Sequence, residues 1–309
     1  MKRKNNHMET LRLRNIPVLK QLTILLIVLI LLLGKGIIDR QQTNGESNSY
    51  ETNQYSHRVE LLEEFELPQS SLEAETAIVW DISSQRVLFS KSPDNVMPLA
   101  SITKLMTLLL TYELGEYTER VAGFKLEELA DLTITSSSNQ GASELANAIG
   151  SKLTETNASK PAFVAAMNLR AKELGLFNMK FHNPTGLDES ETLSGGYGSA
   201  REVAFLMEYI LETDPSILGK SKLTSYKVTN DEGLIYEVTN TNQYVNEITG
   251  LIGSKTGYTT LAGGNLVVAI DVGMNHPVVI VVLGSSPEGR FLDTIRLVSE
   301  ITNQYDVNM

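Results

Sequence analysis

A serine and a lysine lie three residues apart at the start of an apolar stretch, PLASITKLMT, from Pro98 to Thr107. In a helix, residues at this spacing share one face, so the Ser101 hydroxyl and the Lys104 ammonium are expected to be neighbours. A serine is a weak nucleophile that needs an adjacent base, and a lysine serves as that base only if desolvation or a nearby positive charge lowers its pKa. Taken alone, the pair also fits a helix N-cap serine beside a lysine whose stem reaches to water.

Two further segments carry polar side chains that could act beside this pair. In TSSSNQGASELA, the Ser137 hydroxyl and the Asn139 carboxamide come just before a helical pattern, where an N-cap cluster is the simpler interpretation. In GLIGSKTGYTTLAGG, Lys255, Thr256 and Gly257 lie in a strand-like run. A strand edge with these residue types suits an extended peptide and its carboxylate, although a solvated strand end would look the same.

The three segments are far more specific together than apart. Ser-x-x-Lys, Ser-x-Asn and Lys-Thr-Gly, in this order, form the signature of penicillin-binding proteins and the related β-lactamases. The chain from about Thr76 to Ile301 resembles the low-molecular-mass penicillin-binding proteins of the D-alanyl-D-alanine carboxypeptidase family. Four stretches carry this resemblance: LASITKLMT, FHNPTGLD (Phe181 to Asp188), YGSAREVAFL (Tyr197 to Leu206) and LIGSKTGYTTLAGG.

The resemblance implies a role for each residue of the first two motifs. Ser101 would be the nucleophile that attacks the carbonyl of the penultimate D-alanine in a peptidoglycan stem peptide, and Lys104 would take its proton. Ser137 would relay a proton to the leaving D-alanine. Asn139 would hold Lys104 and the substrate amide. β-Lactams would act as covalent inhibitors at the same serine.

The third motif is implied to bind the substrate. Lys255 and Thr256 would bind the terminal carboxylate, and Lys255 would also keep the pKa of Lys104 low. Gly257 completes the motif, and the backbone N–H groups of Ser101 and Tyr258 would form the oxyanion hole. The family's chemistry needs no metal or organic cofactor, and the four histidines form no ligand motif.

Two features depart from what the resemblance leads us to expect. Ser137 follows Ser101 by only 36 positions, so we expect part of the helical region between the first two motifs to be missing. The chain ends soon after its last predicted helix. We therefore expect it to lack the extra β-rich domain and the C-terminal amphipathic anchor found in many relatives.

Other functions remain open at this point. A serine β-lactamase is disfavoured because no Glu-x-x-Leu-Asn lies between the second and third motifs. A DD-endopeptidase would use the same residues, and a β-lactam or cell-wall sensor would acylate but turn over slowly. A purely structural protein would have no reason to keep all three motifs in order.

The N-terminus differs from the rest of the chain in charge and hydropathy. Residues 1–40 hold eight Lys/Arg and two Asp/Glu, whereas residues 41–309 hold 18 and 35, a balance of −17 that argues against a nucleic-acid partner. Leu22 to Gly34 is uncharged and aliphatic, and Val18 to Ile38 would span about 32 Å as a helix. Basic residues before the apolar run place the N-terminus in the cytoplasm.

These features predict three parts of the chain. Residues 1–38 would be a single-pass transmembrane signal-anchor, which places the protein in the cell membrane with its catalytic domain outside. Residues 39–59, polar throughout, would be a flexible tether, and residues 60–309 a DD-peptidase-like catalytic domain. Cleavage near Gly34-Lys35-Gly36 would instead release a secreted protein.

The hydrophobic patterns predict a mixed α/β fold. Two strands are expected within 75–92 around a turn at Ser83-Ser84, and two more at 265–272 and 276–284. Since neither pair makes a stable sheet alone, we expect one antiparallel sheet built from both chain ends, as in a β-lactamase/transpeptidase-like fold. Helical periodicity predicts a helical subdomain between them and a closing helix, over 125–132, 142–152, 161–174, 199–211 and 287–303.

Overall fold

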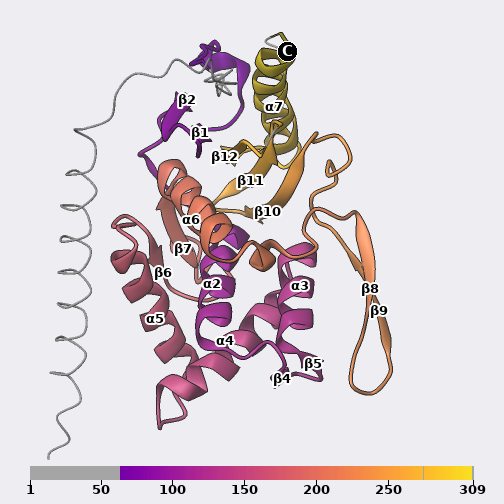
Figure 1. Ribbon diagram of the computed structural model, residues 1–309. Helices are drawn as coiled ribbons and strands as arrows, with labels where there is room; N and C mark the ends of the chain where they lie inside the picture. Colours follow the sequence, from indigo (N-terminus) through magenta and orange to yellow (C-terminus); the bar gives the residue numbers. More distant parts are fainter. Residues whose placement is uncertain (1–62, 274, 308–309) are drawn as a thin grey trace, which may run out of the picture. The chain divides into compact units, whose positions relative to one another are not determined.

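The computed structural model describes residues 63–273 and 275–307, which belong to one compact unit that begins at Val59. Its centre is a five-stranded sheet in the order β10-β11-β12-β1-β2, antiparallel throughout (Figure 1). Strands from the early and late parts of the described sequence pair directly, since β1 lies beside β12. The predicted sheet and mixed α/β fold are therefore confirmed. The strands are β1 Thr76–Asp81, β2 Arg86–Lys91, β10 Leu251–Thr259, β11 Gly263–Asp271 and β12 Pro277–Ser285.

The sheet is buried on both faces, which explains why its central strands are apolar at nearly every position. Alternate residues of β11 and β12 enter two separate cores: Val267 and Val279 lie in one, whereas Val268 and Val278 lie in the other. Helix α7 (Gly289–Val307) packs on β11 and β12 from one side, and α6 (Ala200–Thr213) packs on β1 and β12 from the other.

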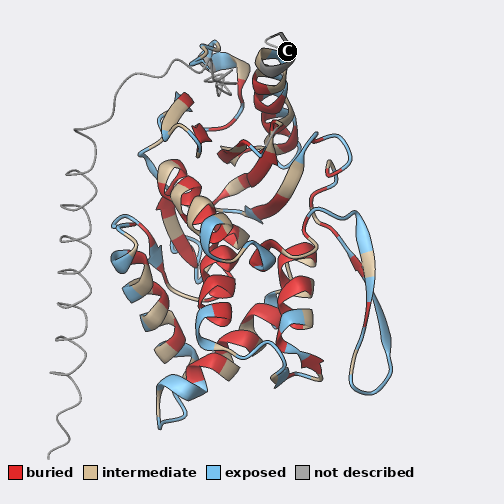
Figure 2. Cartoon of the chain, viewed as in Figure 1, coloured by how far each residue is buried: buried red, intermediate tan, exposed pale blue. Residues whose placement is uncertain are grey.

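The helical region lies on the α6 side of the sheet. Its central helix, α2 (Lys104–Leu114), is buried along nearly its whole length, from Lys104 to Tyr112 (Figure 2). Around it lie α3 (Leu126–Ser136), α4 (Asn139–Leu153) and α5 (Ser159–Glu173). All four helices predicted between the strands are present, and each is longer than the periodic segment that predicts it.

Several small strands have no counterpart in the predicted elements. A three-stranded sheet has the order β3-β7-β6, and two hairpins join β4 to β5 and β8 to β9. Short 3-10 turns η1 (Gln69–Ser71), η2 (Ala100–Thr103) and η3 (Pro215–Leu218) complete the described elements. The strands are β3 Val96–Pro98, β4 Arg120–Val121, β5 Phe124–Lys125, β6 Lys180–Phe181, β7 Gly196–Ser199, β8 Ser225–Thr229 and β9 Ile235–Thr239.

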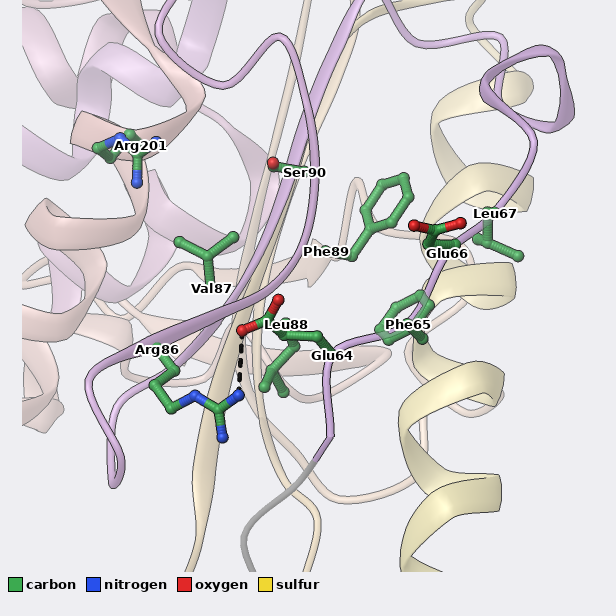
Figure 3. A pocket seen from close by; sticks show the side chains of 10 residues that line it. All are labelled: Glu64, Phe65, Glu66, Leu67, Arg86, Val87, Leu88, Phe89, Ser90 and Arg201. Carbon is green, nitrogen blue, oxygen red and sulfur yellow. Dashed lines mark hydrogen bonds and ion pairs between the residues drawn. The ribbon is translucent and has the colours of Figure 1, made fainter.

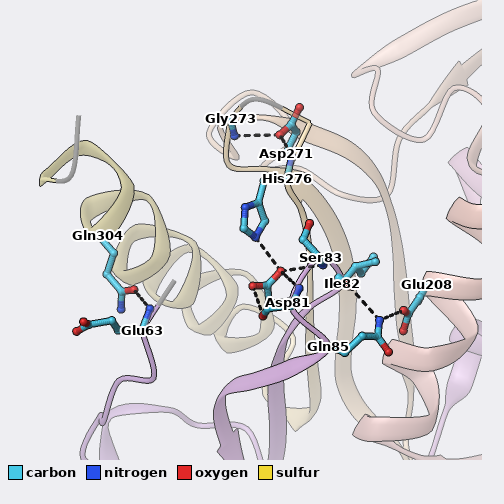
Figure 4. Close-up of polar contacts among 11 residues, drawn as sticks. Glu63, Asp81, Ile82, Ser83, Gln85, Glu208, Asp271, Gly273, His276 and Gln304 are labelled. Atoms are coloured by element: carbon cyan, nitrogen blue, oxygen red, sulfur yellow. Dashed lines mark hydrogen bonds and ion pairs between the residues drawn. The ribbon is translucent and has the colours of Figure 1, made fainter. Parts of the chain in front are cut away.

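A buried carboxylate stabilises the C-terminal end of strand β1 (Figure 4). Asp81, fully buried, accepts from the Ser83 N–H at 3.0 Å and from the Ser84 hydroxyl, and lies 2.8 Å from His276 Nε2. The first two bonds form the predicted turn between β1 and β2. The third ties the end of β1 to the segment that starts β12.

The predicted transmembrane segment and the tether boundaries lie outside the described residues and stay predictions. Within 63–273 and 275–307, no helix combines the length and the apolar character needed to cross a bilayer.

Candidate active site

The nucleophile and base predicted from the first motif are in contact. Ser101 lies in η2 and Lys104 begins α2, and Lys104 Nζ donates to Ser101 Oγ at 2.8 Å. The segment opens as a 3-10 turn rather than an α-helix, and three residues per turn stack positions i and i+3 closely. Ser101 caps no helix and Lys104 is fully buried, so the alternative of an N-cap beside a solvated lysine is wrong.

The backbone just before Ser101 is strained. Ala100 has φ +49°, a left-handed conformation that costs a residue with a Cβ about 1–2 kcal/mol. Two glycines from other segments of the chain lie very close to this turn. A Cβ on Gly186 would lie 1.8 Å from the Ala100 carbonyl oxygen, and one on Gly257 would lie 3.2 Å from the Ser101 nitrogen. The third motif therefore meets the first at backbone distance, with no space for a side chain.

Lys104 has three hydrogen-bond acceptors and no exposed surface. Its Nζ donates to Ser101 Oγ and Asn139 Oδ1, each at 2.8 Å, and to the Thr185 carbonyl at 2.7 Å. Burial lowers the pKa of Lys104 to about 7. A lysine with this pKa is part neutral at neutral pH, which a general base requires.

The second motif lies where α3 ends and α4 begins. Ser137 follows α3 with φ +59°, and Ser138 is the N-cap of α4, accepting from the Gly141 N–H at 3.0 Å. The N-cap interpretation of this cluster is thus right for Ser138 alone. Ser137 is free to contact Lys255, and Asn139, the first residue of α4, contacts Lys104.

The third motif lies on β10 and is buried rather than a solvated strand end. Lys255 is 1% exposed, and its Nζ donates to Ser137 Oγ at 2.9 Å and to the Thr256 carbonyl at 2.7 Å. Burial, followed by the positive charges of Lys104 and Arg290, holds the pKa of Lys255 well below its usual value. For Lys104, burial is the cause that lowers the pKa, and the expected contribution of Lys255 stays a prediction.

Tyr258 follows the motif, and its side chain is 54% exposed while its backbone continues β10. The eight residues predicted for the site thus come together from η2, α2, the α3–α4 junction and β10. They are Ser101, Lys104, Ser137, Asn139, Lys255, Thr256, Gly257 and Tyr258.

Three further residues of the site were missed in the sequence. Thr185 supplies a carbonyl to Lys104, Thr241 Oγ1 lies 2.6 Å from Thr256 Oγ1, and Arg290 Nη1 donates to the Gly257 carbonyl at 2.7 Å. Thr185 lies in FHNPTGLD, a stretch that the resemblance singles out without giving it a role. No motif in the neighbouring sequence marks Thr241 or Arg290, because a loop brings one of them to the strand and a distant helix brings the other.

Other features of the described surface do not compete with this site. A groove of about 810 Å³ runs along β2, where Arg86 pairs with Glu64 and the Phe65 N–H donates to the Leu88 carbonyl (Figure 3). None of the predicted site residues lines it. Within the described ranges, no three His, Cys, Asp or Glu side chains gather as ligands for a metal ion.

Comparison with known proteins identifies similar sequences and structures. The pattern of the D-alanyl-D-alanine carboxypeptidase family, peptidase S11, matches residues 63–122 and 116–287. D-alanyl-D-alanine carboxypeptidase DacF of Bacillus subtilis is 28% identical over 76% of this chain, which spans 64% of that protein's length. A D-alanyl-D-alanine endopeptidase of Escherichia coli is 28% identical over 74% of this chain and 77% of its own length.

Solved structures of related proteins are also similar to this chain. Penicillin-binding protein D2 from Listeria monocytogenes, in its cefotaxime-bound form, is 25% identical with a TM-score of 0.64. The match covers 78% of this chain and all of that one.

Proposed function

The chain belongs to the D-alanyl-D-alanine carboxypeptidase family of serine peptidases, and from this premise we propose that it removes the terminal D-alanine from peptidoglycan stem peptides through an acyl-enzyme on Ser101. One observation carries the proposal. A buried lysine with a pKa of about 7 donates to the hydroxyl of the motif serine at 2.8 Å. When Lys104 is neutral, its Nζ can accept the proton of the Ser101 hydroxyl, which gives the activated nucleophile that acyl transfer needs.

Acylation begins with Lys104 neutral. Ser101 Oγ attacks the carbonyl carbon of the penultimate D-alanine, and its proton passes to Lys104 Nζ. The oxyanion that forms accepts from the backbone N–H groups of Ser101 and Tyr258, and such donors are worth about 3 kcal/mol each. The C–N bond then breaks. The leaving amine takes a proton from the Ser137 hydroxyl, which recovers the one that Lys104 received.

Deacylation repeats these roles with water. Lys104 is neutral again, and a water molecule attacks the ester carbonyl and gives one proton to Lys104 Nζ. The ester C–O bond breaks, Ser101 recovers that proton from Lys104, and the shortened peptide leaves as a carboxylate after its acid proton passes to solvent. Rapid deacylation separates a hydrolase from a sensor that stays acylated.

Substrate binding involves the charge of Lys255. The terminal carboxylate would lie against Lys255 and the Thr256 hydroxyl, where an opposite charge favours the ammonium form of Lys255. The contacts of both side chains support this placement of the carboxylate. Lys255 Nζ lies 2.9 Å from Ser137 Oγ, and Thr256 Oγ1 lies 2.6 Å from Thr241 Oγ1. The carboxylate would thereby sit within reach of the proton relay.

Endopeptidase activity on peptide cross-links is the second candidate, because similar proteins include D-alanyl-D-alanine endopeptidases, such as that of Pseudomonas aeruginosa, 29% identical over 74% of this chain. The same Ser101 would be acylated, but the leaving group would be the side-chain amine of a neighbouring stem peptide. Chromatography of purified muropeptides separates the two reactions, since one releases free D-alanine and the other converts dimers to monomers.

Location at the cell membrane is also a proposal. The basic head and the aliphatic run within residues 1–38 support a single-pass anchor with the catalytic domain outside. Membrane fractionation with N-terminal sequencing of the mature protein tests this. An N-terminus that begins after Gly36 would instead indicate a secreted, cleaved form.

Intact-mass spectrometry with benzylpenicillin tests the enzymatic proposal first. The full chain should gain the mass of one β-lactam, and Ser101→Ala should gain none. A lasting adduct together with release of D-alanine from a D-alanyl-D-alanine peptide supports the carboxypeptidase. Rapid loss of the adduct with penicilloate accumulation would indicate a β-lactamase, whereas an adduct without peptide hydrolysis would indicate a sensor. No adduct would refute the proposal.

A further inference from the structure

The segment from Asn183 to Asp188 touches the site at two places but has no part in the steps above. In the middle of the segment, the Thr185 carbonyl accepts from Lys104 Nζ at 2.7 Å. At its end, Asp188 Oδ1 accepts from the Thr259 hydroxyl at 2.9 Å, and Asp188 Oδ2 accepts from the Leu261 N–H at 3.3 Å. The segment therefore links the base to the end of β10.

Hydrogen bonds within this segment fix the conformation of its backbone. Asn183 Oδ1 accepts from the Thr185 N–H, the Thr185 hydroxyl and the Gly186 N–H, at 2.8 to 3.0 Å. The Thr185 hydroxyl in turn accepts from the Leu187 N–H at 3.1 Å. Gly186, with φ +79°, lies so close to Ala100 that a Cβ would overlap the Ala100 carbonyl. A shift of the segment would therefore displace the residue before the nucleophile.

The end of β10 needs support from outside the sheet. β10 is an edge strand, so it has one strand neighbour, β11. Beyond that ladder, Arg290 holds the Gly257 carbonyl from α7, and Asp188 holds Thr259 and Leu261 from the 183–188 segment. Tyr258, whose backbone N–H is the second oxyanion donor in the proposed mechanism, lies between these two contacts.

We propose that Asp188 is a positioning residue for acylation, holding β10 so that the Tyr258 N–H stands at the correct distance from Ser101. This inference rests on the proposed function, since the acylation of Ser101 is the reaction that it would serve. The hydrogen bonds of Asp188 go to Thr259 and Leu261 rather than to Ser101. Its removal should slow the chemical step, because oxyanion donors act only within a narrow range of distance.

The test compares acylation by a fluorescent penicillin in four single variants of the full chain. Asp188→Asn leaves one carbonyl oxygen for two donors, and Thr259→Val removes one of those donors. Thr259→Ser keeps the hydroxyl. Glu191→Gln, at an exposed position of the same loop, makes the same charge change and is the matched control.

Asp188→Asn and Thr259→Val should each lower the first-order acylation rate constant at saturating penicillin by about 10- to 100-fold. The pH midpoint of the rate should stay at that of the wild type, and Thr259→Ser and Glu191→Gln should acylate normally. A fifth variant that combines Asp188→Asn with Thr259→Val should be no slower than the slower single variant, because both changes weaken the same contact.

Three results would overturn the inference: an Asp188→Asn rate within twofold of the wild type, multiplicative losses in the double variant, or a loss confined to temperatures at which the variant unfolds. A wild type that forms no adduct is a different outcome, which refutes the proposed function itself.

Discussion

The proton affinity of Lys104 determines when the proposed nucleophile is active, and Asn139→Asp changes that affinity with almost no change in shape. Asn139 Oδ1 lies 2.8 Å from Lys104 Nζ, so the variant places a carboxylate oxygen beside a fully buried amine. An opposite charge at this distance favours the ammonium form. We therefore expect the variant to need a higher pH for acylation than the wild type.

The size of the effect follows from the geometry. In the wild type, burial lowers the pKa of Lys104 to about 7, so its neutral fraction should fall about tenfold per pH unit below 7 and level off above it. A carboxylate within hydrogen-bond distance typically shifts a partner's pKa by about 1–3 units. Acylation at pH 7 should then be slower by about 5- to 500-fold, and most of the rate should return by about pH 10.

The assay is the first-order acylation rate constant measured from pH 5 to 10 with a β-lactam in excess. Asn139→Ala is the control, because it removes an acceptor from Lys104 without adding charge and should not move the midpoint upward. The reasoning is refuted if Asn139→Asp slows acylation equally at every pH. Such a result would mean that Asn139 orients the substrate while some group other than Lys104 accepts the serine proton.

Three further predictions concern packing and stability. Gly257→Ala places a Cβ 2.9 Å from the Leu99 carbonyl, so thermal unfolding should report a loss of about 1–3 kcal/mol and acylation should slow at least tenfold. Asp81→Asn disturbs a fully buried acceptor and should lower the free energy of urea unfolding by about 1–3 kcal/mol. Asp94→Asn changes an ion pair in which the Asp94 side chain is 68% exposed, and it should lower that free energy by less than about 1 kcal/mol. Equal losses in the two variants would contradict the burial argument. The folded state lowers the pKa of Lys104, so the unfolded state binds more protons between about pH 7 and 10. As the pH rises across that range, the measured free energy of unfolding of the wild type should therefore increase by on the order of 4 kcal/mol relative to that of Lys104→Met. A pH-independent difference between the two proteins would refute the lowered pKa.

Local patterns predicted much of the sheet and helices, and the reason is physical. β11 and β12 are apolar on both faces because α6 and α7 cover both sides, and such runs are readable in sequence. The helices around α2 show the three- and four-residue spacing of one buried face. The β8–β9 hairpin was missed because most of its residues are exposed, so no hydrophobic alternation marks it.

The site was predictable only as far as its residues stand in compact motifs. Ser101 and Lys104 are three residues apart, and their types and spacing suggest their chemistry. Arg290, by contrast, reaches the Gly257 carbonyl across 33 residues, and the Thr185 carbonyl reaches Lys104 across 81. A backbone carbonyl leaves no trace in the residue type that bears it, so Lys104's third acceptor could not be inferred from sequence.

The two buried lysines acquire distinct roles once the charge of the substrate is considered. Burial lowers the pKa of both Lys104 and Lys255, and the charge of Lys104 lowers that of Lys255 further, so the free site opposes holding two protons. In the proposed complex, one substrate carboxylate can neutralise one ammonium, and it lies on the Lys255 side of the site. Binding would therefore favour Lys255 charged and Lys104 neutral, which is the state that acylation requires. A substrate without that carboxylate would lose reaction rate as well as affinity, because it would leave the two lysines competing for the same proton.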